Sequence, residues 1–137
     1  MSPWSHLANA KHIDRIIAHA RANPTVWEAA WAAAWAAAWD AVKWVAYDAA
    51  RDAAYEAAFE AAYEAAFEAA YDAFKAPRNT RSGAARYAIL ALVAWDRAGG
   101  LMDSSAEQVK VLALLGDQAA ILMYPAIAAM ETTQELA

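Results

Sequence analysis

Three histidines near the start of the sequence are the first residues that could bind a metal. His12 and His19 lie seven residues apart on one face of a predicted helix, and His6 precedes them. A metal held by one helix needs ligands at four-residue spacing or a carboxylate on the same face, and Asp14 points to another face. The spacing therefore predicts no metal site, and we expect histidines that pack between helices or face solvent.

A catalytic site would need ionisable groups held in unlike environments. The acids of this sequence are numerous but regular, and the one constellation at a predicted chain reversal is Asp96 beside Arg97, close to Gly99 and Gly100. A salt bridge at a helix end explains that pair. The sequence has no glycine-rich phosphate loop, nucleophile elbow or zinc motif, so we predict a protein that is not an enzyme and has no cofactor.

A four-residue repeat dominates the sequence from Trp27 to Phe74. The first position of each tetrad is aromatic except at Lys43 and Arg51, the second position holds the acids, and the other two are almost always alanine. No glycine or proline interrupts the repeat. Because Ala and Glu are strong helix formers, the repeat predicts helix throughout.

The period of the repeat arranges its side chains in a spiral. Four residues turn an α-helix by about 400°, so each stripe moves by about 40° per repeat. No single face of such a helix stays covered, and we expect the aromatic stripe to be enclosed by several short helices or by neighbouring copies. The predicted self-association surface is the apolar first half of the repeat, formed by Trp27, Trp31, Trp35, Trp39, Trp44 and Tyr47.

The second half of the repeat carries one acid per tetrad and forms a predicted acidic stripe. Its members are Asp52, Glu56, Glu60, Glu64, Glu68 and Asp72. Carboxylates one tetrad apart rise by about 6 Å per step along a helix, close to the phosphate spacing of a nucleic-acid strand. The stripe is therefore either a solvated face or a decoy that occupies the basic groove of a nucleic-acid-binding or defence protein.

The length of the repeat requires a break or an assembly. An unbroken helix over 25–76 would be roughly 75 Å long, too long for a compact chain of this size. A capping box beginning at Thr25 starts the helical region, and Pro77 ends it. The break is expected between Lys43 and Arg51, where the aromatic frame is interrupted twice.

Shorter helices are predicted on both sides of the repeat, in residues 5–22 and 83–131, with 132–137 as a tail. Ser5 is the expected cap of the first helix. In the C-terminal segment we expect helices over Gly83–Ala98, ended by Gly99-Gly100; over Ala106–Leu115, capped by Ser104 or Ser105 and stopped by Gly116; and over Asp117–Met130, kinked at Pro125.

A basic turn is predicted after the repeat, formed by Lys75, Arg78, Arg81 and Arg86. These cations could dock on an acidic partner, including the acidic stripe of another copy. They could equally well neutralise the ends of their own helices.

The composition restricts the partners and the compartment. The net charge is −5, so no basic excess favours nucleic acid. The longest uncharged stretches are much shorter than the about 20 residues that a bilayer needs, and the start of the sequence is unlike a signal peptide. We therefore expect a soluble protein that is not secreted, located in the cytoplasm of a bacterial host cell or in a virion.

The C-terminal third resembles hypothetical proteins of tailed-phage and bacterial genomes. The features that carry the resemblance are the Trp95-Asp96 pair, the turn over 114–117 (Leu-Leu-Gly-Asp) and Pro125, which follow Ala/aromatic tetrads. The resemblance covers roughly residues 83–130 and the character of the repeat. It implies a phage-encoded accessory protein and no particular activity.

The sequence as a whole predicts one all-α domain over residues 1–137. We expect a helical bundle built around a long Ala-rich helix or a broken helix pair, with shorter C-terminal helices. The predicted function is that of a non-enzymatic, self-associating protein, either a homo-oligomer or a component of a larger assembly. The alternative is an acidic inhibitor of a basic protein partner.

Overall fold

The structure is a computed structural model that describes residues 2–34, 39–75 and 83–136, without the side chains of 39–44, 75 and 133–136. The predicted all-α class is confirmed, since the described residues form helices and no strand. The helices are α1 (Ala10–Ala22), α2 (Pro24–Ala33), α3 (Trp39–Glu60), α4 (Glu64–Lys75), α5 (Gly83–Ala94), the 3-10 helix η2 (Asp96–Asp103), α6 (Ala106–Leu114) and α7 (Gln118–Leu136). None of the helices in these ranges is long and apolar enough to cross a membrane.

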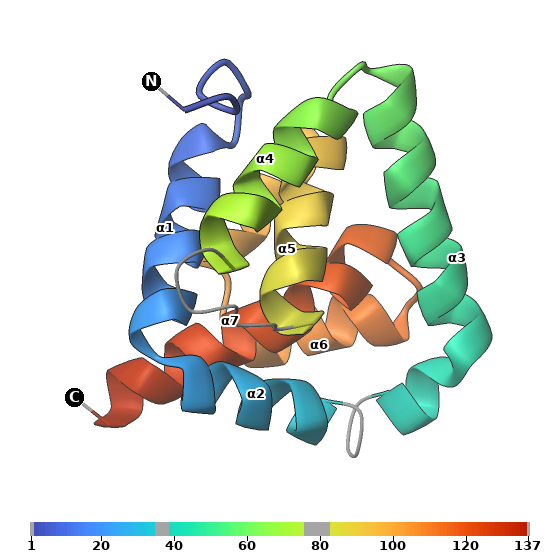
Figure 1. The fold of residues 1–137 in the computed structure, drawn as a ribbon. Helices are drawn as coiled ribbons and strands as arrows, with labels where there is room; N and C mark the ends of the chain where they lie inside the picture. Colours follow the sequence, from blue (N-terminus) through green and yellow to red (C-terminus); the bar gives the residue numbers. More distant parts are fainter. Residues whose placement is uncertain (1, 35–38, 76–82, 137) are drawn as a thin grey trace.

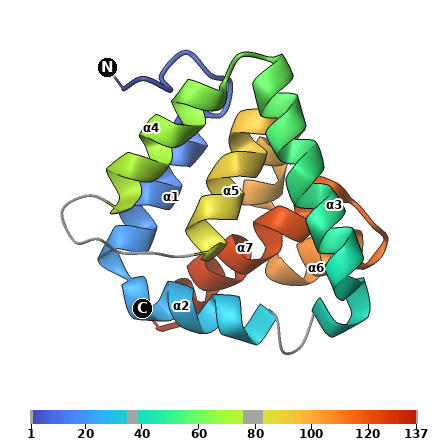
Figure 2. The same ribbon diagram turned by 45° about the vertical axis from the view of Figure 1, so that its right-hand side comes forward.

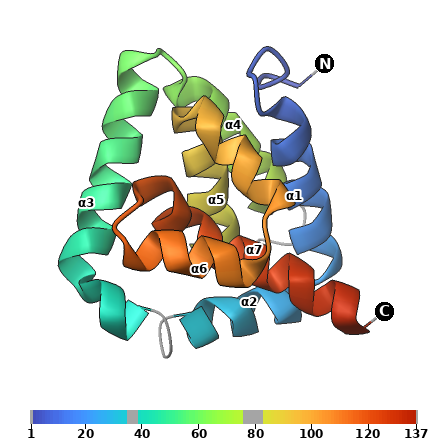
Figure 3. The ribbon, with the colours of Figure 1, turned by 180° about the vertical axis from the view of Figure 1, so that it is seen from behind.

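The centre of the bundle is α5, which lies between α1 and α3 and behind α4 (Figures 1 and 2). Eight of its twelve residues are buried, including Ile89, Leu90 and Leu92. Beyond Arg86 this helix has no charged side chain, so it can be covered on all sides. The repeat helices α2, α3 and α4 lie around α5. The helices α6 and α7 lie on the opposite side of the bundle, which Figure 3 turns toward the viewer.

The expected break between Lys43 and Arg51 is wrong, because α3 continues through both positions. Lysine and arginine interrupt the aromatic frame, but both are good helix formers and do not end a helix. The repeat is instead interrupted after Glu60, where α3 ends and the chain turns back into α4 (Figure 1). Before α3, the helix α2 ends at Ala33, and residues 35–38 lie outside the described part.

The turn between α3 and α4 is a Schellman motif with alanine at the left-handed position. Ala62 has φ +62°, its N–H donates to the Phe59 carbonyl (3.0 Å), and the Tyr63 N–H donates to the Ala58 carbonyl (2.8 Å). Glycine is usual at this position because a Cβ strains the left-handed conformation. The chain therefore adopts a strained backbone within a sequence of strong helix formers.

The spiral of the repeat is visible in the exposure of its aromatic residues. Tyr47 is 3% exposed, whereas Phe59, three tetrads later on the same helix, is 70% exposed. Three steps of about 40° rotate the stripe by about 120°, which is enough to carry a ring from the core to solvent. The turn at Ala62 resets the phase, and Phe67 on α4 is again 1% exposed.

Several predicted helix starts and ends are corrected by the structure. The first helix begins at Ala10 with Asn9 at its N-cap, not at Ser5, and α2 begins with Pro24 after Asn23, so the predicted Thr25 capping box is absent. Neither N-cap side chain caps its helix: the Asn9 amide donates to the Leu92 carbonyl and the Asn23 amide to the His19 carbonyl. The C-terminal segment differs in the same way: α5 ends at Ala94, Gly99 and Gly100 lie inside η2, and α7 continues past Met130 to Leu136.

The caps around α6 are confirmed. Ser105 and Gln108 form a reciprocal capping box at its start, and Gly116, with φ +93°, ends it. Asp117 then caps α7, because its Oδ1 accepts a hydrogen bond from the Ala120 N–H (2.9 Å). Pro125 lies inside α7.

Candidate interaction surface

The outer side of α6 carries the densest group of exposed aliphatic side chains in the described part of the chain. These four side chains, named here the α6 face, are Val111 (48% exposed), Leu112 (37%), Leu114 (47%) and Leu115 (79%). Two other large apolar residues, Val45 (79%) and Phe59 (70%), are exposed on α3. The α6 face therefore holds most of the large exposed hydrophobic residues that the structure describes.

Helix geometry explains why these residues cannot all be buried. Val109 and Ala113, one turn apart, are the buried residues of α6. At about 100° per residue, Val111, Leu114 and Leu115 lie about 120–180° from the midpoint of that buried pair, and Leu112 lies on the flank, about 80° from it. Because α6 packs on α7 with its inner side, the outer side is left uncovered on the surface seen in Figure 3.

An open groove lies at the edge of the α6 face. It has a volume of about 400 Å³ and is lined by Ser104, Gln108, Val111 and Leu112. No charged side chain lines it, and the charges nearby on α6 are one acid and one base, Glu107 and Lys110. The lining of the groove is therefore uncharged, and the acids Asp103 and Glu131 lie beside the start of α6.

The described residues of the predicted self-association surface are buried or half-buried. Trp27 is fully buried, and its Nε1 donates to His19 Nδ1 (2.8 Å). Tyr47 is buried as well, packed edge-on against Tyr87 with ring centroids 5.4 Å apart. Both rings are covered by the chain's own helices and offer no surface to a second copy.

The ring of Trp31 is half-buried and stacks on Tyr87 with centroids 5.8 Å apart. It lies so close to Gly83 that a Cβ at that position would come within 2.6 Å of the ring. This contact holds α2 against the start of α5. The side chains of Trp35, Trp39 and Trp44 lie outside the described part.

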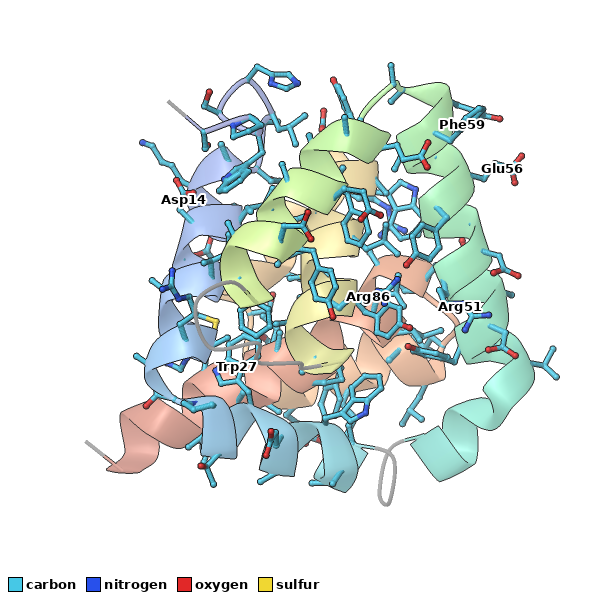
Figure 4. The ribbon with its side chains drawn as sticks, viewed as in Figure 1. Asp14, Trp27, Arg51, Glu56, Phe59 and Arg86 are labelled. Carbon is cyan, nitrogen blue, oxygen red and sulfur yellow. The ribbon has the colours of Figure 1, made fainter. Side chains whose placement is uncertain are left out.

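Arg86, predicted as part of a basic turn, points into the bundle (Figure 4). Its Nη2 donates to the Tyr55 hydroxyl (2.8 Å), and its guanidinium lies 5.1 Å from the centre of the Tyr71 ring. These contacts join α3, α4 and α5 around one cation. Arg86 is thus a structural residue; Arg78, Arg81 and the side chain of Lys75 lie outside the described part.

The six residues of the acidic stripe are all exposed, but they do not form one series. The turn at Ala62 divides them into three on α3 and three on α4, two helices that run in different directions (Figure 1). On α3, Arg51 lies 3.5 Å from Asp52 and 3.6 Å from Asp48. The continuous right-handed row of carboxylates expected for a nucleic-acid decoy is therefore interrupted.

The histidines have structural contacts. Burial, and then the positive charge of Arg15, lowers the pKa of His19 from its usual value near 6.5, and its Nδ1 accepts the hydrogen bond from Trp27. His6 packs edge-on against Tyr63 at a centroid distance of 5.8 Å. Within the described residues, no three metal-binding side chains lie close enough together to hold an ion.

The expected salt bridge near Asp96 has another partner. Arg97 Nη1 lies 3.0 Å from Asp117 Oδ2, the residue that also caps α7, and its guanidinium lies 5.7 Å from the centre of the Trp95 ring. Arg97 thereby fixes the start of α7 against η2. The acid that pairs with Arg97 is therefore Asp117 and not Asp96, its neighbour in the sequence.

The α6 face was not predicted, although the sequence contains a signal for it. Five of the seven residues 109–115 are Val or Leu. A single buried face of a two-turn helix accommodates about three such residues, so some of the five had to be exposed.

Comparisons with protein-family models, curated proteins and solved structures found no match.

Proposed function

We propose that this chain is a non-enzymatic protein that acts by associating with further copies of itself through the α6 face. The observation that carries the proposal is the exposure of four large aliphatic side chains on one short helix. Exposed apolar groups of this density mark association surfaces in folded proteins. The partner is a second copy of this chain.

A two-fold arrangement suits this surface. In an isologous dimer both partners use the same patch, so every contact between two different residues forms twice. Two α6 helices packed antiparallel, with axes about 8–10 Å apart, would set the four aliphatic side chains of one copy against the same four of the other. No charged residue of the stretch 111–115 would be enclosed, because that stretch contains none.

The distribution of charge favours the same contact. The chain has a net charge of −5, and six exposed acids lie on α3 and α4. Two acidic molecules repel each other except where their surfaces are locally neutral. The stretch 111–115 carries no charge, so two copies can bring these residues together without opposing like charges within that stretch.

The test is the molar mass of the chain in solution, measured by light scattering after size exclusion over a range of concentrations. We expect a concentration-dependent dimer for the unmodified protein. The pair Leu112→Glu and Leu115→Glu should abolish this concentration-dependent dimer, because four carboxylates would be enclosed per dimer. The matched control is Val45→Glu, which adds an acid at a residue of α3 that is as exposed as Leu115 and should leave the dimer unchanged.

Two results would contradict the proposal. One is a single-chain mass at every concentration for the unmodified protein. The other is a dimer that Val45→Glu and the α6 pair weaken equally, because that would show a general effect of charge.

A decoy function of the acidic stripe is a second proposal, supported by the exposure of all six of its acidic residues. It predicts binding to a basic groove that weakens with salt. Glu56→Lys separates the two proposals: it should impair a decoy and leave self-association through α6 intact. Glu56 lies on the outer side of α3, on the part of that helix nearest the turn (Figure 4).

A further inference from the structure

We propose that the α3–α4 turn is a hinge through which two copies exchange halves. In the exchanged dimer α3 and α4 form one continuous helix, and residues 2–60 of each copy pack on residues 64–136 of the other. The second copy then completes the same core that one chain forms alone. This inference depends on the hinge and not on the α6 face.

The first argument is the strain in the turn. Two helices of this chain end in the same motif, α6 with Gly116 at the left-handed position and α3 with Ala62. Glycine adopts that conformation freely, whereas for alanine the left-handed conformation is unfavourable. Straightening the chain at Ala62 would return this residue to its preferred helical conformation.

The second argument is that the hinge has the sequence of a helix. Residues 59–66 are Phe-Glu-Ala-Ala-Tyr-Glu-Ala-Ala, and residues 67–74, which are helical, are Phe-Glu-Ala-Ala-Tyr-Asp-Ala-Phe. No glycine, proline or asparagine marks the turn. Local preference therefore favours a continuous helix from Trp39 to Lys75, which would be about 55 Å long.

The third argument is that exchange preserves the packing. α4 buries Ala66, Phe67, Ala70 and Phe74 against the bundle, and the Arg86–Tyr55 hydrogen bond joins α5 to α3. In an exchanged dimer the contacts of α4 with α1 and α3, and the Arg86–Tyr55 hydrogen bond, form again between chains with the same partners, while the contacts between α4 and α5 stay within one chain. Only the hinge and the protein concentration then decide between the closed chain and the dimer.

The exposed ring of Phe59 lies where the exchanged copies would meet. It is 70% exposed in the closed chain and lies three residues before Ala62. In the dimer two long helices would pass each other at the hinge, and the two Phe59 rings would lie in the region of the crossing. Their burial would add a contact that the closed chain lacks.

The hinge can be tested by substitutions that change only its preference. Ala62→Gly relieves the strain of the closed turn and weakens the straight helix, so it should lower the exchanged fraction. Because both effects act in each of the two chains, the association constant should fall by about a hundredfold or more. Ala62→Val should raise it, since a β-branched residue is worse in the left-handed conformation. Ala65→Gly is the matched control, at an exposed alanine that is the second residue of α4 and follows the left-handed position of the turn.

Exchange is identified by a cross-link between the halves. The chain has no cysteine, so Tyr55→Cys and Arg86→Cys introduce the only thiols, at two side chains in contact. A short bifunctional maleimide joins them within a chain in the closed form and between chains in the exchanged form. A dimer through the α6 face gives only the intrachain product, so this readout separates the two proposals.

The experiment refolds the protein at low and at high concentration, in the Leu112→Glu/Leu115→Glu background, and follows molar mass and cross-linking. We expect a dimer that persists on dilution, an interchain product at high concentration, and a decrease of both with Ala62→Gly but not with Ala65→Gly. The absence of an exchanged dimer at high concentration overturns the proposal. Equal effects of the two glycine substitutions also overturn it.

Discussion

The side-chain amide of Asn9 donates a hydrogen bond to the Leu92 carbonyl across 2.9 Å and so joins the start of α1 to the end of α5. The same nitrogen also lies 3.1 Å from the Trp95 carbonyl. Asn9 is 5% exposed and is the one buried polar residue that the structure describes. The end of the central helix is therefore satisfied by a side chain more than eighty residues away in the sequence.

Replacing Asn9 should destabilise the fold. Asn9→Ala leaves buried carbonyls without a donor, and we expect a loss of about 2–3 kcal/mol in the free energy of unfolding, measured with urea. Asn23→Ala is the control: Asn23 donates to the His19 carbonyl (3.0 Å) at a half-buried site and should cost less. Equal losses for both variants would show that Asn9 has no special role.

Gly99 should tolerate no side chain, whereas its neighbour should. A Cβ at Gly99 would overlap the side-chain oxygen of Asn9, while a Cβ at Gly100 would meet no atom within 4 Å. We expect Gly99→Ala to lower the free energy of unfolding by about 1–3 kcal/mol and Gly100→Ala to have little effect. A neutral Gly99→Ala would show that Asn9 can move away.

The two Schellman turns should respond to reciprocal substitutions with opposite sign. Ala62→Gly should raise the free energy of unfolding by about 1 kcal/mol, and Gly116→Ala should lower it by a similar amount. Both can be measured by denaturation of dilute protein, where association does not contribute. A loss of stability in Ala62→Gly would mean that the turn is not strained.

Stability should depend on pH through His19. Its pKa is lower in the folded protein than in the unfolded chain, so the unfolded chain binds more protons as the pH falls below about 6.5, and stability decreases there. Protonation would also place a hydrogen on Nδ1, which accepts from Trp27. In His19→Gln this part of the pH dependence should disappear, as measured by urea unfolding at a series of pH values. An unchanged pH profile would contradict the assignment.

Features determined within a few residues could be predicted from the sequence. The capping box at Ser105, the stop at Gly116 and the cap at Asp117 each depend on contacts between close neighbours. The turn at Ala62 could not be predicted, because residues with the same local sequence are helical elsewhere in the chain. Its position depends on the packing of α4 against α1 and α5, which only the whole fold determines.

The candidate surface was missed for a related reason. The spiral of the repeat suggested that tryptophans need a partner, and the rotation it implies is present between Tyr47 and Phe59. In the structure the chain folds back on itself, and its own helices enclose Trp27 and Tyr47 without a second copy. The side chains left uncovered are those of α6, where residues 109–115 hold more Val and Leu than one face of a short helix can bury.

A single cysteine on α6 tests most directly whether this face meets its own copy. Leu112→Cys places the only thiol of the chain near the two-fold axis of the proposed dimer, and Val45→Cys places it at an exposed residue of α3. Our account predicts that mild oxidation links two chains at residue 112 at least about tenfold faster than at residue 45, because association raises the effective concentration of thiols. Equal rates at the two positions would contradict the proposed interface.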